Sequence, residues 1–392
     1  MNDNKRNDDN SLRDRFKGNE ELDEYTRRKK AARKKKRLRE KKIKKIRKIA
    51  AIVTAAIVLC IFIFIIISAV AKNNKKSAST NTYSDSKTDS SDYTENIRKV
   101  SLITSRFENS NKSEGPTFIS LSKIGRYEQS NSYVDLTDDE TIYSENVCLI
   151  DLDSAKVIAG RNYDKVIYPA SMTKVMTLIV AVENLTDLSQ TYTFTDAEIA
   201  ALFAEDASMA GFKGGETVDV TDMLYGLALP SGADAAIGLA KLVAGSEDAF
   251  VDMMNEKCEE LGLAKTHFCN PTGLHDDNHY STCMEMGVIM AYAMSNELCA
   301  KILSTYQYTT KATPFHEEGI ELTSTTFARM YGTEADGVLI DAGKTGYTYE
   351  AGQCLMTSAV KDNKRYVLVC SNAVNRYHTI YDNIYIYGNY LP

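Results

Sequence analysis

A serine and a lysine three residues apart, Ser171 and Lys174, are the first side chains in this sequence whose types and spacing could do chemistry. They begin an apolar stretch that runs to Leu185 and covers nearly the whole circumference of a helix, which predicts a buried central helix. Residues three apart on a helix project from the same face. A half-buried lysine can lose its proton near neutral pH and then accept the proton of a neighbouring serine hydroxyl. The alternative is a helix cap with a surface lysine, but a lysine among core residues needs a purpose.

Two later segments place polar groups among small residues. Pro230-Ser231-Gly232-Ala233-Asp234 is expected to form a loop between two helices, and Gly343-Lys344-Thr345-Gly346-Tyr347 lies beside a predicted strand. Each has an ordinary explanation on its own, as a turn and as a strand end with a solvated lysine. In this order, the three segments form the serine-x-x-lysine, serine-loop and lysine-threonine-glycine set that is typical of penicillin-binding proteins and β-lactamases.

From about residue 144 to 372 the chain resembles the low-molecular-mass penicillin-binding proteins that act as serine-type D-alanyl-D-alanine carboxypeptidases. Beyond the three segments, the resemblance includes DMLYGLALPSG, ELGLAKTHFCNPTGL, NHYST and AGQCLMTSA. It implies an α+β domain of the β-lactamase/transpeptidase-like fold, an antiparallel sheet flanked by helices, and no cofactor. The implied partners are peptidoglycan stem peptides as substrate and β-lactams as covalent inhibitors.

The resemblance also implies a role for each residue of the first two segments. Ser171 would be the acylated nucleophile and Lys174 the base that activates it, while Ser231 would relay a proton between Lys174 and the leaving D-alanine. Covalent catalysis of this kind divides hydrolysis into acylation and deacylation, and water completes the second step.

The third segment would bind the substrate. Lys344 and Thr345 would hold the terminal carboxylate, since they offer a cation and a hydroxyl. Gly346 would let the substrate backbone come close. The backbone N–H groups of Ser171 and Tyr347 would form an oxyanion hole, in which two fixed donors stabilise the charge that develops on the attacked carbonyl oxygen.

One position departs from the family pattern. Two residues after the loop serine the family usually has asparagine, whereas this sequence has Ala233. Alanine cannot replace the donors and acceptor of an amide. Asp234 is a substitute in sequence terms, although capping of the following helix is the expected role for it.

The elements that must position these segments alternate between strand and helix types. Residues 147–153 and 156–160 read as one hairpin, and residues 354–360 and 365–371 as another. Between the hairpins we expect helices over 221–229, 233–244 and 246–261, a helix that starts at a Thr282–Glu285 capping box, and a final amphipathic helix containing Ile380, Ile384 and Tyr387. Strands at both ends with helices between them predict an α+β domain whose sheet joins both ends.

Composition and charge indicate how the whole chain of 392 residues is organised. With 43% hydrophobic and 26% charged residues, a sizeable core is feasible and disorder throughout is excluded. Residues 1–48 hold 21 of the 47 Lys/Arg and 9 of the 53 Asp/Glu, so the tail carries +12 and the remainder −18. Such asymmetry indicates a segment that meets a membrane or a nucleic acid.

Residues 49–71 decide between these two partners. They form an apolar run of 23 residues without a charge, which as a helix is about 34 Å long and exceeds the roughly 30 Å hydrocarbon core of a bilayer. We therefore expect a transmembrane helix. The basic flank at 27–48 should stay in the cytoplasm, so that the rest of the chain lies outside the cell membrane and no nucleic-acid partner is expected. A signal peptide cleaved after Ala71 is the alternative, but the run is longer than a signal h-region.

The predicted organisation is therefore a basic cytoplasmic tail (1–48), a transmembrane helix (49–71), a low-complexity stalk (72–140) and a catalytic domain (141–392). Within the stalk, residues 97–140 contain short apolar pieces, and the sequence leaves open whether they pack on the domain. No metal is expected, because His275 and His279 have no third ligand apparent in the sequence. Eight cysteines are present, and their spacing gives neither pairing nor oxidation state.

These observations predict an extracytoplasmic carboxypeptidase that removes the terminal D-alanine of stem peptides through an acyl-enzyme on Ser171. One alternative is a β-lactamase of the same fold, which would need a deacylating carboxylate on a separate loop. The other is a non-catalytic penicillin-binding or wall-binding regulatory protein, for which Ala233 is the argument.

Overall fold

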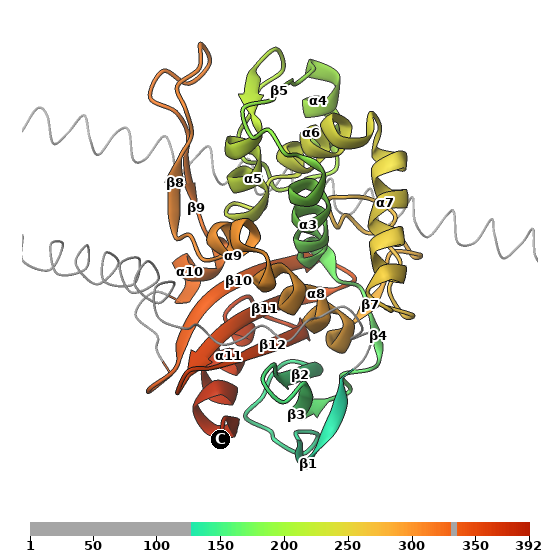
Figure 1. The fold of residues 1–392 in the computed structure, drawn as a ribbon, viewed down its shortest axis with the longest axis vertical. Coiled ribbons are helices and arrows are strands. Elements are labelled where there is room, and N and C mark those ends of the chain that lie inside the picture. Colours follow the sequence, from blue (N-terminus) through green and yellow to red (C-terminus); the bar gives the residue numbers. More distant parts are fainter. Residues whose placement is uncertain (1–126, 331–334) are drawn as a thin grey trace, which may run out of the picture. The chain divides into compact units, whose positions relative to one another are not determined.

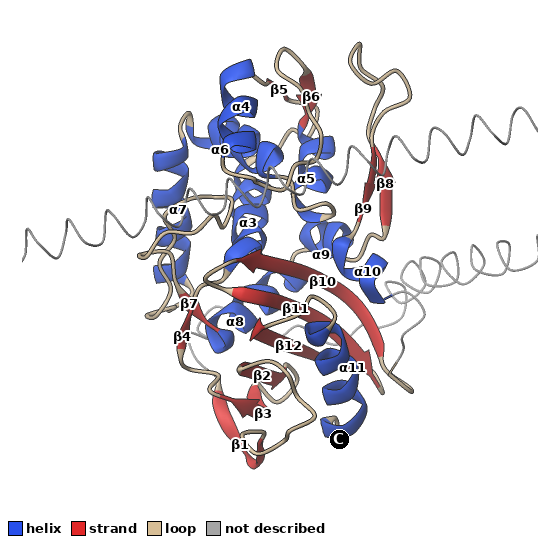
Figure 2. Cartoon of the chain, turned by 180° about the vertical axis from the view of Figure 1, so that it is seen from behind, coloured by secondary structure: helices blue, strands red, loops and turns tan. Residues whose placement is uncertain are grey.

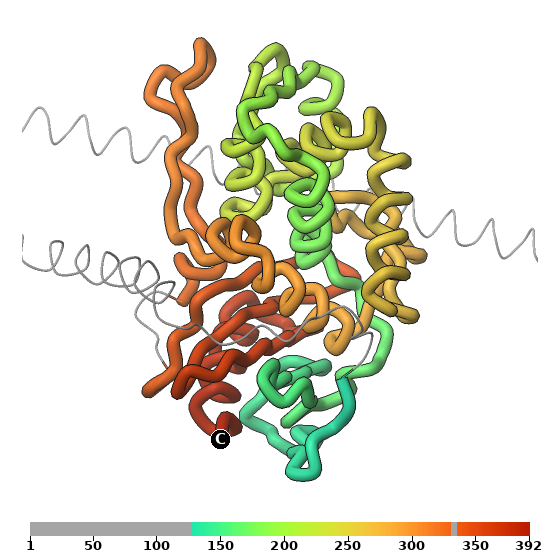
Figure 3. Tube along the Cα trace, viewed as in Figure 1, coloured from blue at the N-terminus to red at the C-terminus, as the bar shows by residue number. Residues whose placement is uncertain are grey.

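A six-stranded sheet joins the two ends of the described part of the chain (Figure 1). The computed structural model describes residues 127–330 and 335–392. The strand order is β1-β3-β2-β12-β11-β10, so the first hairpin lies beside the last, as the trace in Figure 3 shows. The strands of this sheet are β1 (Glu128–Asp135), β2 (Asn146–Asp151), β3 (Lys156–Arg161), β10 (Leu339–Thr348), β11 (Gly352–Lys361) and β12 (Lys364–Ala373).

The two faces of the sheet are covered by different helices. Because side chains alternate along a strand, β2 contributes to both faces. Cys148 and Ile150 join the large core beneath the central helices. Val147 and Leu149 join a second core with α11 (His378–Tyr390), which Figure 2 shows on the opposite face. The predicted mixed α+β architecture, a sheet flanked by helices, is thus confirmed.

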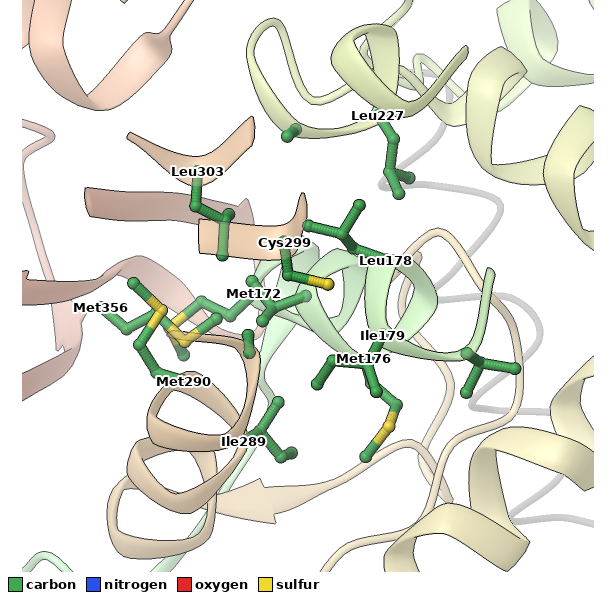
Figure 4. Packing of buried hydrophobic residues seen from close by; sticks show 14 of the residues in the cluster. Met172, Met176, Leu178, Ile179, Leu227, Ile289, Met290, Cys299, Leu303 and Met356 are labelled. Atoms are coloured by element: carbon green, nitrogen blue, oxygen red, sulfur yellow. The ribbon is translucent and has the colours of Figure 1, made fainter. Parts of the chain in front are cut away.

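The helices between β3 and β10 build the larger layer. Its centre is α3, whose Leu178 and Ile179 are buried in one cluster with Cys299 and Ile289 from two neighbouring helices (Figure 4). The elements of this layer are the 3-10 turn η1 (Ala170–Thr173), α3 (Lys174–Asn184), α4 (Asp196–Ala204), α5 (Val220–Ala228), α6 (Ala233–Ala244), α7 (Glu247–Glu260), α8 (Cys283–Ser295), α9 (Glu297–Leu303) and α10 (Thr325–Met330).

Three short strand pairs tie the loops of this layer together. They are β4 (Val166–Ile167) with β7 (Ser281–Thr282), β5 (Thr191–Thr193) with β6 (Thr217–Asp219), and β8 (Gln307–Thr309) with β9 (Glu321–Thr323). The first pair matters for the site, because β4 leads directly into η1.

Strand β1 answers one open question and corrects one prediction. The sequence left open whether residues 97–140 pack on the domain, and residues 127–140 do so, because β1 pairs with β3. This pairing is parallel, so the sheet is not antiparallel throughout. Sequence pattern gave no sign of it, because β1 is an edge strand of mostly exposed polar residues. It is held by its pairing with β3 and by the side chain of Tyr133, which packs against the core and donates to the Gly160 carbonyl oxygen.

The capping box predicted at Thr282 is half formed. The Thr282 side chain accepts a hydrogen bond from the backbone N–H of Glu285, as expected. The Glu285 carboxylate does not return the bond. It accepts instead from the backbone N–H of Lys265 and from the Thr266 hydroxyl, so it links α8 to the loop that precedes the site.

The predicted tail, membrane span and most of the predicted stalk lie outside the described residues. Among the helices within 127–330 and 335–392, none is long and apolar enough to cross a bilayer.

Candidate active site

Ser171 lies on η1, at the point where the chain leaves the sheet edge and enters the central helix. The preceding residue, Ala170, has a left-handed φ of 48°. Gly273 packs directly on it, with a φ of 78°, and a Cβ at Gly273 would lie 2.0 Å from the Ala170 carbonyl oxygen. Only glycine fits such an approach. The loop around Gly273 therefore supports the turn that presents Ser171, which is itself partly exposed.

Lys174, the first residue of α3, is 3% exposed. Its Nζ lies 3.2 Å from Ser171 Oγ and donates to the Thr272 carbonyl oxygen at 2.6 Å. Burial lowers the pKa of Lys174 to about 7, and the nearby carboxylate of Asp234 limits the fall. Near neutral pH, Lys174 is therefore an uncharged amine in a large fraction of the molecules, and it lies within reach of the Ser171 proton.

Ser231 and Lys344 form a second serine–lysine pair. Ser231 follows α5, has a φ of 68° and is 5% exposed. Its Oγ accepts a hydrogen bond from Lys344 Nζ at 2.8 Å, and the same Nζ donates to the Thr345 carbonyl oxygen at 2.9 Å. Burial holds the pKa of Lys344 well below its ordinary value, and the charges of Lys174 and Arg329 lower it further. The two lysines are therefore coupled electrostatically.

The rest of the third segment lies on β10 beside the nucleophile turn. A Cβ at Gly346 would lie 3.0 Å from the Pro169 carbonyl oxygen and 3.2 Å from the Ser171 backbone nitrogen, so the strand and η1 are in near contact. Thr345 is 5% exposed, and Tyr347 is 58% exposed at the sheet edge. The three predicted segments are thus brought together from η1, the α5–α6 loop and β10.

Ala233, at the position where the family usually has asparagine, lies in an apolar environment. It is 1% exposed and packs in a small apolar cluster with Leu202 and Ile237. Asp234 is no substitute either, because its carboxylate accepts backbone N–H groups from residues 210, 211, 212 and 235. It caps its own helix only in part and mainly holds the loop at 210–212.

The structure adds groups that sequence reasoning missed. The Thr325 hydroxyl lies 2.7 Å from that of Thr345, and the Thr272 carbonyl holds Lys174. The second lies in the segment ELGLAKTHFCNPTGL, which carries the resemblance but suggested no role. Thr325 had no such signal.

A metal ion has no obvious site in the described ranges. No group of three or more His, Cys, Asp or Glu side chains there could hold one. His275 stacks edge-on against Tyr168, and His279 is buried beneath η1. The seven cysteines of the described residues are unpaired thiols.

Comparison with known proteins agrees with this geometry. A family model described as D-alanyl-D-alanine carboxypeptidase, peptidase S11, matches residues 133–375. The chain is 35% identical over 233 residues to D-alanyl-D-alanine carboxypeptidase DacF of Bacillus subtilis, covering 59% of this chain and 57% of the relative. It is 34% identical over 238 residues to DacA of Escherichia coli, covering 58% and 55%. The chain thus spans about half the length of these curated relatives.

Solved structures share the fold. The Streptomyces K15 DD-transpeptidase aligns with a TM-score of 0.57 at 27% identity, over 64% of this chain and 98% of that one. A D-alanyl-D-alanine carboxypeptidase from Mycobacterium tuberculosis aligns with a TM-score of 0.58 at 27% identity, over 67% and 96%.

Proposed function

The chain belongs to the peptidase S11 family of D-alanyl-D-alanine carboxypeptidases, and from that premise we propose that it removes the terminal D-alanine of peptidoglycan stem peptides. The observation that carries the proposal is the buried Lys174 amine, 3.2 Å from Ser171 Oγ, with a pKa lowered to about 7. An ordinary surface lysine would be almost fully protonated at neutral pH and could not act as a base.

Acylation follows from this pair. Neutral Lys174 takes the Ser171 hydroxyl proton while Oγ attacks the carbonyl carbon of the D-alanyl-D-alanine bond. The carbonyl oxygen becomes an oxyanion, which the backbone N–H groups of Ser171 on η1 and Tyr347 on the adjacent strand β10 would stabilise. The C–N bond then breaks, and D-alanine leaves with a proton returned through Lys174 or Ser231. Water finally hydrolyses the ester.

Substrate binding is assigned to the neighbouring strand. The terminal carboxylate of the peptide would be held by Lys344 and by the Thr345 hydroxyl. Burial makes a charged Lys344 costly in the free protein, so an arriving carboxylate favours its protonated form and is bound in return.

Covalent labelling tests this proposal. Penicillin should add to Ser171, and mass spectrometry of the digested protein should locate the adduct there. Ser171→Ala should remove the adduct, whereas Ser295→Ala, at an exposed helix serine, should retain it. An adduct at another serine would refute the assignment.

Release of D-alanine separates the proposed enzyme from its alternative. Ala233 in place of the usual asparagine favours, as a second candidate, a protein that binds penicillin covalently but does not turn over peptides. Measurable D-alanine release from a synthetic pentapeptide by the native chain, and none by Ser171→Ala, would exclude that candidate. Rapid hydrolysis of penicillin would instead indicate a β-lactamase.

We also propose that residues 49–71 anchor the protein in the cell membrane, with residues 1–48 in the cytoplasm and the catalytic domain outside. The uncharged span and its basic flank support this arrangement. In cells whose wall has been removed, external protease should digest the domain and spare the tail. A protected domain would overturn both the orientation and the substrate.

A further inference from the structure

His279 lies directly beneath the turn that carries the nucleophile and has no role in the mechanism above. Its side chain is 2% exposed. One ring nitrogen, Nε2, lies 2.7 Å from Thr173 Oγ1. Thr173 is the residue immediately before the base Lys174 and two after Ser171, and it is fully buried.

The other ring nitrogen fixes the tautomer. Nδ1 accepts a hydrogen bond from the backbone N–H of Cys269 at 3.1 Å. A nitrogen that accepts carries no proton, so in the neutral ring the proton lies on Nε2 and is donated to Thr173. The neutral form is the stable one here. Burial, with the charges of His267, His275 and Lys174, lowers the pKa of His279 to about 4, and Asp276 only partly opposes this.

The two hydrogen bonds join the two parts of the site that hold Lys174. Thr173 belongs to the turn between nucleophile and base. Cys269 begins the loop whose Thr272 carbonyl accepts from Lys174 Nζ and whose Gly273 supports Ala170. A single imidazole therefore connects the turn with the loop that supports it.

We propose that His279 is a positioning residue for acylation: its Nε2–H, bonded to Thr173, sets the placement of Ser171 and Lys174 relative to each other. This rests on the proposed function of the site. His279 touches neither substrate nor the reacting atoms, so its effect passes through Thr173.

Two substitutions separate the two hydrogen bonds. His279→Gln places an amide N–H near the position of Nε2 and keeps the donor to Thr173. His279→Asn is shorter, places its carbonyl oxygen near Nδ1, and keeps only the acceptor for Cys269. His267→Asn is a matched control, since His267 is an exposed histidine whose Nδ1 is bonded to the Asn278 carbonyl.

The measurement is the rate constant of acylation by penicillin, with initial binding, melting temperature and the fraction of Ser171 labelled at completion. His279→Asn should acylate about 10- to 100-fold more slowly, with initial penicillin binding little changed. His279→Gln should regain most of the rate, and His267→Asn should match the native protein. Thr173→Val should reproduce the loss, and combining it with His279→Asn should add little.

Three results would overturn the proposal. Equal rates in His279→Asn and the native chain would do so. Acylation rates that fall in step with the melting temperatures of His279→Asn and His279→Gln would also overturn it. Such a result would mean that His279 only stabilises the fold. Fully additive losses in the double variant would show that the two side chains act independently. Failure of the proposed function is distinct, since it would appear as no Ser171 adduct in the native protein.

Discussion

Acylation should depend on pH through Lys174. The pKa of about 7 means that raising the pH from 6 to 8 increases the neutral fraction of the amine from about one in eleven to about ten in eleven. The rate of acylation by penicillin should therefore rise about tenfold over this range and reach a plateau above pH 8. A lysine with its ordinary pKa of 10.5 would give a rate that is still rising at pH 9.

The assay is stopped-flow acylation by a chromogenic or fluorescent penicillin between pH 5.5 and 9.5, with the melting temperature measured at each pH. Lys344 also has a lowered pKa, so it must be separated from Lys174. Lys344→Arg provides the control, because arginine stays charged throughout this range. Its fixed charge disfavours a second one nearby, so the midpoint of the Lys174 titration should move to lower pH.

Two outcomes would refute this reasoning. A rate that does not change between pH 6 and 8 would mean that Lys174 is not the titrating base. If Lys344→Arg folds normally but its acylation rate no longer depends on pH, the titrating group is Lys344 and not Lys174.

Three further predictions follow from the packing. Lys174→Met should abolish acylation yet raise the melting temperature at pH 6, and a lower melting temperature would contradict this. The pKa of Lys174 is lower in the folded than in the unfolded protein, so the charged amine weakens folding below pH 10.5, by up to about 5 kcal/mol. The hydrogen bond to a carbonyl that the substitution removes contributes less, about 1–3 kcal/mol. Ala233→Asn should lower the melting temperature without speeding acylation, because the amide would enter the apolar cluster with Leu202; faster acylation would show that the amide position is open. Gly346→Ala should slow acylation about tenfold or more with a small change in melting temperature, since its Cβ, 3.0 Å from the Pro169 carbonyl oxygen, would push β10 from η1. An unchanged acylation rate in the same assay would show that acylation does not need β10 to lie this close to η1.

Local patterns predicted the features that depend on neighbours in sequence. The helix predicted at 233–244 is α6 with the same bounds, and the two hairpins are β2–β3 and β11–β12. The three polar segments were identifiable because their chemistry is concentrated in a few consecutive residues. Their meeting at one place could be expected only through resemblance to a family.

The features that were not predicted depend on contacts distant in sequence. The position of Glu285 matched a local capping pattern, yet its carboxylate accepts hydrogen bonds from Lys265 and Thr266, which lie about 20 residues away. Asp234 resembled a cap but holds the loop at 210–212. His279 raised only the question of a metal, because nothing within a few residues of it indicates its bond to Thr173. A polar side chain has several possible hydrogen-bond partners, and the tertiary fold determines which of them lies within reach.

The order of strands has a consequence for how the domain is made. Asn146 of β2 and Ser371 of β12, whose side chains are hydrogen-bonded, are 225 residues apart in sequence. Closing so large a loop is entropically costly and slow, and the middle of the sheet must wait for it. The ribosome must therefore synthesise everything between β2 and β12 before β2 can pair with its second neighbour, although its first neighbour, β3, follows directly. Strand β10, which completes the site around Ser171, also arrives late. In a protein exported as we propose, the emerging polypeptide would remain without its central sheet during transfer, and nucleophile, base and carboxylate clamp would assemble in one late event outside the membrane.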